Sequence, residues 1–328
     1  MIARLGEVAT GIRPIIPADL PGCASVFYAA LDELTARHGQ PPPIRNEAGM
    51  IGFFGHLLTT DGERAWLSGG IDGVDAFGFA HLRGSLWFLS FLFVRPESQA
   101  QGVGRQVLLR TFPHDPSAAA DDGMGGASAW NGVLATCADS IQPVSTGLYT
   151  GYGMVPRLPL FTMLGRPRRG VLPGLPRSVE RCGFDDLVDT APDGHRRLVD
   201  LVGEIDQQVL GYDRPVDHRF WRVADRRGWV YRDRADGAIL GYGYAQPSGR
   251  LGPVALLDGE LLPAVLGDLM STLQPAGDWQ IFVPGAAERV MVALLHAGFR
   301  CEGTPALYCA SRIGPDLSRY IVASFALL

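Results

Sequence analysis

The chain has 328 residues, of which 47% are hydrophobic and 19% charged, and its formal net charge is −5. This length and balance predict a globular protein with room for two domains, and the negative charge gives no general attraction to nucleic acid. No apolar run reaches the ~18 residues that a membrane-spanning helix needs, and the start lacks a signal-peptide pattern. We therefore expect a cytoplasmic protein with neither a nucleic-acid nor a membrane partner.

The residue types exclude several further classes. All 29 basic residues are arginine, so no lysine is present for a Schiff base or a P-loop. The seven histidines show no HExxH spacing, and the five cysteines show no CxxC pair. We expect reduced cysteines and no metal site.

The first half is predicted to alternate between strands and helices. Apolar periodicity, the stop signal at Gly39 and the N-cap signal at Asn46 define the early helices. A loop rich in Ala, Asp, Gly and Ser is expected at 112–132, which we interpret as mobile. The predicted strands are 11–17, 64–71, 75–83, 85–94, 133–138 and 158–165, and the predicted helices are 18–39, 46–60, 103 to about 110, and 144–152.

A segment with three prolines and several arginines, 166–178, is predicted to be a linker. The order of elements that follows it resembles the first half and suggests duplication. The predicted helices are 195–211, 260–273 and 287–298, and the predicted strands are 228–233, 238–246, 250–257, 279–285 and 305–310.

The stretch "VRPESQAQGVGRQVLL", Val94 to Leu109, follows an apolar strand and opens a helix. Consecutive backbone N–H groups at a helix N-terminus form a concave anion site, because they lack intrahelical partners and the helix dipole is positive there. Gly102 and Gly104 would let a phosphate approach the backbone closely. Arg105 would add positive charge. The hexad Gln99-Ala100-Gln101-Gly102-Val103-Gly104 is thus suited to a pyrophosphate.

Other readings of this hexad remain open at this point. A dinucleotide fold would need a third glycine, and a P-loop would need GK[ST]; both are missing. A glycine turn before a core helix, with no ligand, is the plain structural alternative.

Two motifs together resemble the GNAT acetyltransferases. The first is the run Gln99-x-x-Gly102-x-Gly104 after the fourth strand, and the second is "LYTGYGM", Leu148 to Met154, which is similar to the family's L-Y-x-x-x-G-F. Met154 replaces the usual Phe, and Gln142 stands where the family often has Asn. The two motifs lie farther apart than usual, and the loop 112–132 accounts for the excess. The resemblance covers residues 11 to about 165.

The resemblance implies a fold, a cofactor and a role for several residues. The implied cofactor is acetyl-CoA, with its pyrophosphate on the backbone of residues 99–105, which include Ala100, Gln101 and Val103. Leu92, Phe93 and Val94 would align the pantetheine arm like an added strand. The implied fold class is α+β, with two GNAT-like domains, each a mixed, mostly antiparallel sheet flanked by helices.

The second half resembles the same fold without its chemistry. It has no Q-x-x-G-x-G, and Leu294 stands at the position that corresponds to Tyr149. We predict an acetyl-CoA-binding domain over 1–165, the linker 166–178, and a degenerate GNAT-like domain over 179–328.

Acetyl transfer to an amine needs a proton for the departing thiolate, a polarised carbonyl and a base. Tyr149 is at the family's position for the proton donor, and a hydroxyl of pKa ~10 can protonate a thiolate of pKa ~8.5. A backbone N–H near Phe93 would polarise the carbonyl. The strand 85–94 carries no acid, so Ser90 is the candidate that would position a water. Asp32, Glu33 and His81 are alternatives for the base, and each has a plain structural reading. Tyr149 has one too, as a core residue.

The segment "GYDRPVDHRFW", 211–221, is dense in polar and aromatic residues. It would either line a substrate pocket or form a turn with a helix cap.

From these features we expect an N-acetyltransferase that joins the acetyl group of acetyl-CoA to a primary amine of a small molecule, by direct attack in a ternary complex. The alternatives are acetylation of a protein N-terminus or lysine, and a catalytically weak acyl-CoA-binding or sensor protein. The acceptor and the oligomeric state do not follow from the sequence.

Overall fold

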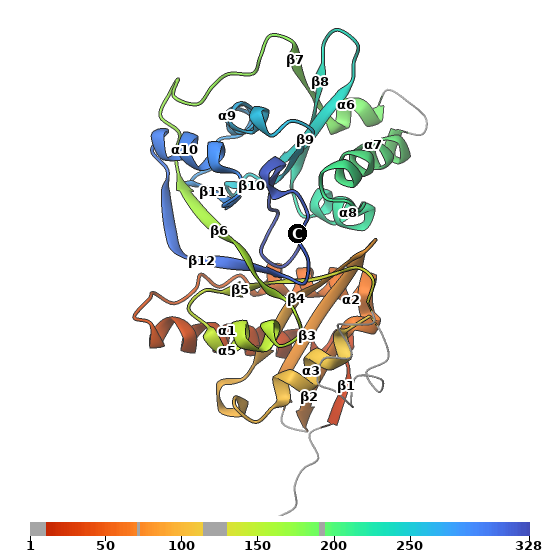
Figure 1. Ribbon diagram of the computed structural model, residues 1–328, viewed down its shortest axis with the longest axis vertical. Coiled ribbons are helices and arrows are strands. Elements are labelled where there is room, and N and C mark those ends of the chain that lie inside the picture. Colours follow the sequence, from red (N-terminus) through yellow and green to blue (C-terminus); the bar gives the residue numbers. More distant parts are fainter. Residues whose placement is uncertain (1–10, 71–72, 114–129, 190–193) are drawn as a thin grey trace, which may run out of the picture. The chain divides into compact units, whose positions relative to one another are not determined.

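The computed structural model describes residues 11–70, 73–113, 130–189 and 194–328 (Figure 1). Residues 114–129, which make up most of the predicted loop 112–132, lie outside the described residues. The chain forms two compact units. The first comprises residues 1–82 and 87–134, and the second comprises residues 83–86 and 135–328.

The first unit contains strands in the order β1-β2-β3-β4, with β1 antiparallel to β2 and β2 antiparallel to β3. The strands are β1 (Gly11–Pro14), β2 (Ala65–Gly70), β3 (Gly73–Arg83) and β4 (Leu86–Val94). The helices are α1 (Leu20–Arg37), α2 (Glu47–Asp61) and α3 (Val103–Thr111). These elements agree with those predicted from the sequence to within a few residues at their ends.

Local signals explain where these helices begin and end. The Asn46 side chain accepts a hydrogen bond from the backbone N–H of Gly49 at 3.0 Å, which confirms it as the N-cap of α2. Gly39, just after α1, has a φ of +63°, a left-handed conformation that favours glycine and ends a helix.

Phenylalanines from four elements form the core of the first unit. Phe54 of α2 is fully buried, and its ring centroid lies 5.3 Å from that of Phe77, 5.1 Å from Phe79 and 5.0 Å from Phe91. Phe93, near the end of β4, packs edge-on against Phe27 of α1 at 4.8 Å. These contacts fix β4 against the two helices, so the strand that leads to the glycine turn is held on a rigid support.

The strands of the second unit lie in the order β5-β12-β6-β11-β10-β9-β8-β7, and β13 pairs with β10. They are β5 (Val133–Asp139), β6 (Val155–Gly165), β7 (Val179–Gly183), β8 (Arg227–Asp233), β9 (Ile239–Ala245), β10 (Arg250–Leu256), β11 (Trp279–Pro284), β12 (Arg300–Ala310) and β13 (Tyr320–Ile321). The helices are α5 (Pro143–Thr150), α6 (Phe184–Asp189), α7 (Gly194–Val209), α8 (Pro215–Val223), α9 (Leu262–Thr272) and α10 (Glu288–His296). The pairing of β10 with β11 is parallel, and the other registered pairs are antiparallel. The fold class is thus the predicted α+β, with mostly antiparallel sheet.

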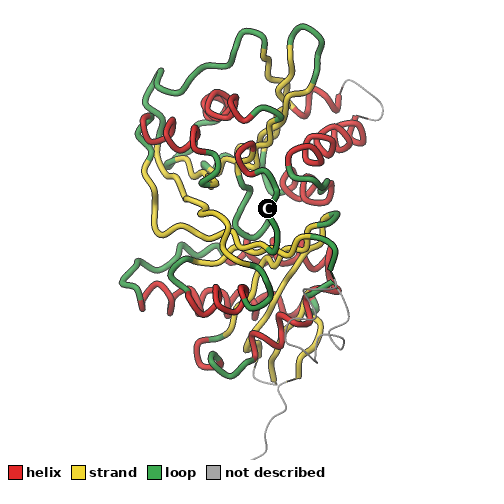
Figure 2. Tube along the Cα trace, in the orientation of Figure 1, coloured by secondary structure: helices red, strands yellow, loops and turns green. Residues whose placement is uncertain are grey.

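The compact units do not coincide with the predicted ranges 1–165 and 179–328, because strands cross over in the sheet. β6, expected as the last strand of the first domain, lies between β12 and β11 and pairs with both. β12, near the end of the chain, also pairs with β5. Residues 166–178 run without helix or strand from β6 to β7 (Figure 2). Leu172 and Leu175 from this segment pack against the core of the second unit.

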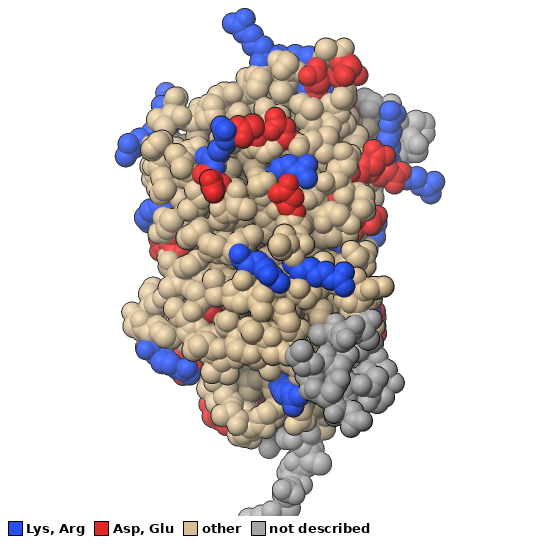
Figure 3. Space-filling view, in the orientation of Figure 1, with Lys and Arg blue, Asp and Glu red and all other residues tan. Residues whose placement is uncertain are grey.

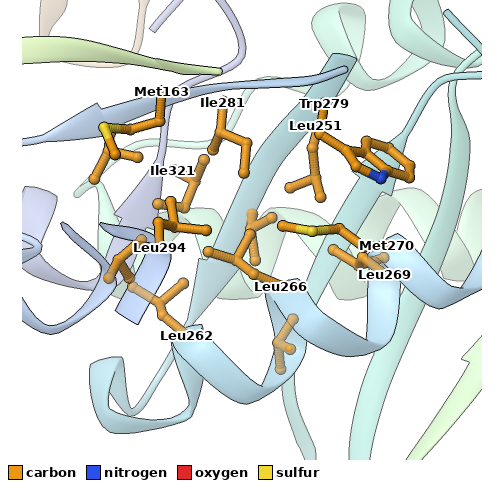
Figure 4. Close-up of a cluster of buried hydrophobic side chains, with 14 of the residues drawn as sticks. Met163, Leu251, Leu262, Leu266, Leu269, Met270, Trp279, Ile281, Leu294 and Ile321 are labelled. Atoms are coloured by element: carbon orange, nitrogen blue, oxygen red, sulfur yellow. The ribbon is translucent and has the colours of Figure 1, made fainter. Parts of the chain in front are cut away.

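One face of the second unit's sheet packs against α9. Leu262, Leu266 and Leu269 recur at helical spacing, are fully buried, and meet Leu251 of β10 and Ile281 of β11 in one apolar cluster (Figure 4). A Cβ at Gly243 of β9 would lie 2.6 Å from Leu269, so glycine at that position lets α9 approach the sheet.

The other face of β9 carries a buried polar network centred on Asp206 of α7. Asp206 accepts hydrogen bonds from Arg214 Nε at 2.8 Å and from the Tyr242 hydroxyl at 2.5 Å, and His218 Nε2 lies 2.8 Å from the same carboxylate. His218 Nδ1 lies 2.8 Å from the Tyr244 hydroxyl. Burial alone would raise the pKa of Asp206, but the charge of Arg214 and the hydrogen bonds hold it below its usual range.

A second buried ion pair joins residues that are distant in the sequence. Arg83 forms two 2.8 Å hydrogen bonds to the Asp217 carboxylate, and both residues are buried. Removing one partner of such a pair would leave an uncompensated buried charge. In the segment 211–221, therefore, Arg214, Asp217 and His218 serve the packing of the second unit.

We predict that the chain loses stability as the pH rises from about 9 to 12. Burial raises the pKa of Cys309 from 9.0 to about 11 and that of Tyr320 from 10.0 to about 12, and many other buried tyrosines and cysteines shift in the same direction. Above pH 9 the unfolded chain therefore binds fewer protons than the folded one, so the free energy of unfolding falls with pH. Arg226 and Arg250 oppose this trend but are outnumbered. Urea unfolding at pH 8 and pH 10.5 measures the effect, and equal free energies at the two values would contradict it.

Candidate functional site

The predicted phosphate turn lies in the first unit, between β4 and α3. Ala100 has a φ of +62° and Gly102, the N-cap of α3, has a φ of +78°. Ala100, Gln101 and Gly102 are exposed. Within the described part of the chain, the backbone N–H groups of residues 100–104 donate no hydrogen bond. The turn therefore presents a row of free donors at the positive end of a nine-residue helix.

The two glycines of the turn have different tasks. Gly102 has open space around its Cα, so glycine is favoured there by its left-handed backbone. A Cβ at Gly104 would lie 3.0 Å from Val94 Cγ2, so glycine there lets the start of α3 approach the end of β4. The helix N-terminus is thus held next to the strand predicted to align the pantetheine arm.

The two glutamines of the hexad brace the turn with their side chains. Gln99 Nε2 donates to the carbonyl of Val94 at 3.2 Å, and Gln101 Nε2 donates to the carbonyl of Glu97 at 3.1 Å. The main chain is left to face a ligand. Arg105 is exposed on the first turn of α3, where a guanidinium adds to the positive potential of the helix end.

Leu92, Phe93 and Val94 form the end of β4, and all three side chains are partly buried. Phe93 belongs to the phenylalanine core, while Leu92 and Val94 pack near Gly78 and Gly104 respectively. The Val94 carbonyl already accepts a hydrogen bond from Gln99 Nε2, and the pairing of this strand with an extended ligand stays a prediction.

Two residues that the sequence suggested separately are joined in the first unit. Ser90 Oγ lies 2.9 Å from Nδ1 of His81, a hydrogen-bond distance. His81 is fully buried and stacks on Phe88 at 5.3 Å, whereas Ser90 is only partly buried. The pair therefore has a fixed inner member and a more accessible outer hydroxyl, an arrangement that can orient a water or relay a proton.

The other candidate bases take part in ion pairs. Asp32 pairs with Arg45, and Glu33 pairs with Arg37 one turn along α1. Both acids are partly exposed, at 35% and 33% of their side chains. One oxygen of each carboxylate, Asp32 Oδ1 and Glu33 Oε2, is however buried and has no hydrogen-bond partner among the described residues. The reading of a solvated helix face therefore fits these two acids only in part.

Tyr149 and Gln142 belong to the second unit, at the end and the start of α5. Tyr149 is 5% exposed, and burial raises its pKa above the ordinary 10, with the nearby Cys309 acting in the same direction. Its hydroxyl therefore stays protonated at neutral pH, and the same shift makes it a weaker acid than an ordinary tyrosine. Gln142 is the N-cap of α5, and its side chain makes no capping bond. Met154 is fully buried at the position where the resemblance expects a phenylalanine.

In the second half, a segment near the end of the chain, residues 320–322, pairs with both β10 and β11. β10 and β11 pair only at residues 250–251 and 280–281. Beyond these residues β13 pairs with β10, and the N–H of Val322 donates to the carbonyl of Phe282 on β11 at 3.2 Å. An added strand from the same chain thus bridges β10 and β11. β13 is two residues long, and no sequence signal predicted it.

A hollow of about 500 Å³ lies beside the starts of α9 and α10. It is lined by three acidic residues and two arginines, and thus carries no excess of positive charge for a pyrophosphate: Asp258, Glu260, Glu288, Arg289 and Arg319. Arg289 is paired with Glu260 at 2.7 Å, and Arg319 with Asp316 at 2.8 Å.

The face of the molecule in Figure 3 carries charges of both signs, scattered among a majority of neutral residues. Among the helices that the structure describes, none has the combined length and apolarity to span a bilayer.

Sequence reasoning missed several side-chain arrangements. The Ser90–His81 contact and the Arg83–Asp217 pair depend on strand register and on residues 134 positions apart. The density of polar and aromatic residues at 211–221 was the one signal for the Asp206 network. No sequence signal indicated that Arg226 and Arg250 lie near each other.

No protein-family model and no curated protein sequence matches the chain. Solved structures do match it in fold. A candidate acetyltransferase from Pyrococcus horikoshii is 15% identical, with a TM-score of 0.68 over 100% of this chain and 99% of its own. A GCN5-related N-acetyltransferase from Sphaerobacter thermophilus is 17% identical, with a TM-score of 0.58 over 94% and 97% of the two chains.

A tandem GNAT protein from the clavulanic acid biosynthesis pathway is 14% identical, with a TM-score of 0.54 over 93% of this chain and 99% of its own. These matches span both predicted halves. They confirm the resemblance drawn from the two motifs: the chain has the tandem fold of the GNAT acetyltransferases.

Proposed function

We propose that the chain is an N-acetyltransferase that moves an acetyl group from acetyl-CoA to a primary amine of a small molecule. The observation that carries the proposal is the turn 99–105, with free N–H donors at the start of α3, on a GNAT fold. The acyltransferase class is supported by the fold, and the small-molecule acceptor is the expectation from the sequence.

The residues of the turn fit the diphosphate of coenzyme A. Five consecutive N–H groups donate no hydrogen bond to any residue that the structure describes, Gly102 supplies the left-handed corner, and Arg105 supplies positive charge. Residues 92–94 would hold the pantetheine arm by their main chain. Acetyl-CoA, when bound, supplies an activated thioester that an amine can attack.

The remaining chemistry is assigned to side chains of this chain. The Ser90–His81 pair would orient a water that accepts a proton from the amine. A backbone N–H near Phe93 would stabilise the negative charge that develops on the carbonyl oxygen. Tyr149 would donate its hydroxyl proton to the departing thiolate. Burial raises the pKa of this hydroxyl and makes it a weaker acid than an ordinary tyrosine, so the role rests on the position of Tyr149 in the second motif.

We expect amine-dependent release of free thiol when the purified chain is mixed with acetyl-CoA and a panel of small primary amines. The panel should contain amino sugars, amino acids and aliphatic amines, with peptides bearing a free N-terminus or lysine as the comparison. Turnover on peptides alone would replace the small-molecule acceptor by a protein acceptor. Binding of acetyl-CoA without turnover on any amine would support the sensor alternative and contradict the proposal.

A further inference from the structure

Two arginines of the second unit, Arg226 and Arg250, lack a carboxylate partner among the described residues. Arg226 follows α8, and Arg250 is the first residue of β10. Both side chains are partly buried. The two most deeply buried arginines of this unit do have acidic partners, since Arg83 pairs with Asp217 and Arg214 with Asp206. Burying a positive charge without a carboxylate partner costs free energy. The absence of such a partner for Arg226 and Arg250 therefore needs a physical reason.

Main-chain contacts hold the two guanidinium groups near each other. Arg226 Nη1 donates to the carbonyl of Gly252, which lies two residues after Arg250 on β10, and Arg226 Nη2 donates to the carbonyl of Ala323 at 3.3 Å. Burial, and then the positive charge of Arg250, lower the pKa of Arg226 from 12.5 to about 9. The two cations therefore repel each other, and the described residues supply no anion to offset them.

The guanidinium of Arg250 is positioned by an aromatic ring. It lies over Phe282 at 4.2 Å from the ring centroid, and Phe282 is itself packed against Phe325 at 4.2 Å. A ring contact fixes the guanidinium plane and uses none of its N–H groups. Within the described residues those five donors have no acceptor. A planar guanidinium held in this way is suited to bidentate binding of an oxyanion.

We propose that Arg226 and Arg250 form a binding site for the carboxylate or phosphate group of a small-molecule ligand. Arg250 would contact the oxyanion with its fork of donors, and Arg226, tethered to Gly252 and Ala323, would add the second charge. The site is built from residues of the second unit alone, and it does not depend on the acetyl transfer proposed above.

The test uses the full-length chain with inorganic phosphate and succinate as probes. The thermal midpoint is followed at constant ionic strength, with sodium chloride as the reference. We expect at least one probe to raise the midpoint at millimolar concentration, and Arg250→Gln to weaken that binding by about tenfold or more. Arg227→Gln is the matched control, because Arg227 is exposed at the adjacent position, and it should change binding less than twofold. Binding of phosphate alone would indicate a phosphate group on the ligand, and binding of succinate alone would indicate a carboxylate. Binding of both would show that the site accepts either group.

Inorganic phosphate can also bind to the turn 99–105 and raise the thermal midpoint from there. Only the part of the rise in midpoint that Arg250→Gln removes is therefore assigned to the Arg226–Arg250 site. Arg250→Lys covers the case in which the glutamine variant does not fold, since it keeps the charge but loses the fork. No stabilisation of the wild-type chain beyond sodium chloride would overturn the proposal. So would equal stabilisation of the wild-type and both Arg250 variants.

Discussion

Replacing Gly104 by glutamate should weaken the binding of coenzyme A by about 100-fold or more while leaving the chain folded. The new carboxylate would stand among the free N–H groups at the start of α3, where the diphosphate is proposed to bind. Two like charges about 5 Å apart repel by roughly 3 kcal/mol at an effective dielectric of about 20. The helix itself tolerates the change, because an acidic side chain in the first turn interacts favourably with the helix dipole. Calorimetric titration with coenzyme A measures the loss.

Gly104→Gln is the matched control for this variant. It introduces the same crowding against Val94 Cγ2, where a Cβ would lie at 3.0 Å, but no charge. We expect the glutamine variant to bind coenzyme A clearly more tightly than the glutamate variant. Gly102→Pro should also abolish binding, but proline cannot adopt the φ of +78° found at Gly102, so its effect would include a distorted turn. Unchanged affinity in folded Gly104→Glu would place the diphosphate elsewhere.

The second large effect is expected for Tyr149→Phe, which should lower kcat by about 10²–10⁴-fold. The ring and its burial are kept, so the free energy of unfolding should change by only about 1 kcal/mol. The affinity for coenzyme A should change far less than kcat, because the hydroxyl acts only as the thiolate departs. Steady-state kinetics with an amine from the panel, and the melting temperature, are the two measurements.

Tyr152→Phe is the control for Tyr149→Phe, since Tyr152 is 4% exposed and lies three residues away. It should leave kcat within a few-fold of the wild type. A near-normal kcat for Tyr149→Phe would remove this tyrosine from the mechanism and leave water as the proton source. Its raised pKa would then reflect core packing alone.

The sequence predicted most elements and the glycine turn before α3 because their signals are local. The cap at Asn46, the stop at Gly39 and the hexad before α3 each depend on a few adjacent residues, and each is found where it was expected. The fold class was implied by the resemblance of the two motifs to the GNAT acetyltransferases.

The features that the sequence did not reveal are set by long-range pairing. The pairing that places β6 between β12 and β11 joins residues from 114 (Gly165 and Trp279) to 155 (Val155 and Ala310) positions apart in the chain, and no local pattern encodes it. No local pattern encodes β13 either, because a strand of two residues is too short to show the alternation of apolar and polar side chains. Ser90 and His81 were recognised as polar residues on adjacent strands, but their hydrogen bond follows from register, which the alternation of side chains did not fix.

We expect the chain to bind acetyl-CoA once, on the turn 99–105. The second half lacks the hexad, β13 pairs with β10 and Val322 bridges to β11, and acidic residues line the hollow beside α9 and α10. Calorimetric titration of the full-length chain with acetyl-CoA should therefore give one site per chain, and Gly104→Glu should weaken it by about 100-fold or more. Two equivalent sites per chain, or one site whose affinity Gly104→Glu leaves unchanged, would contradict acetyl-CoA binding on this turn.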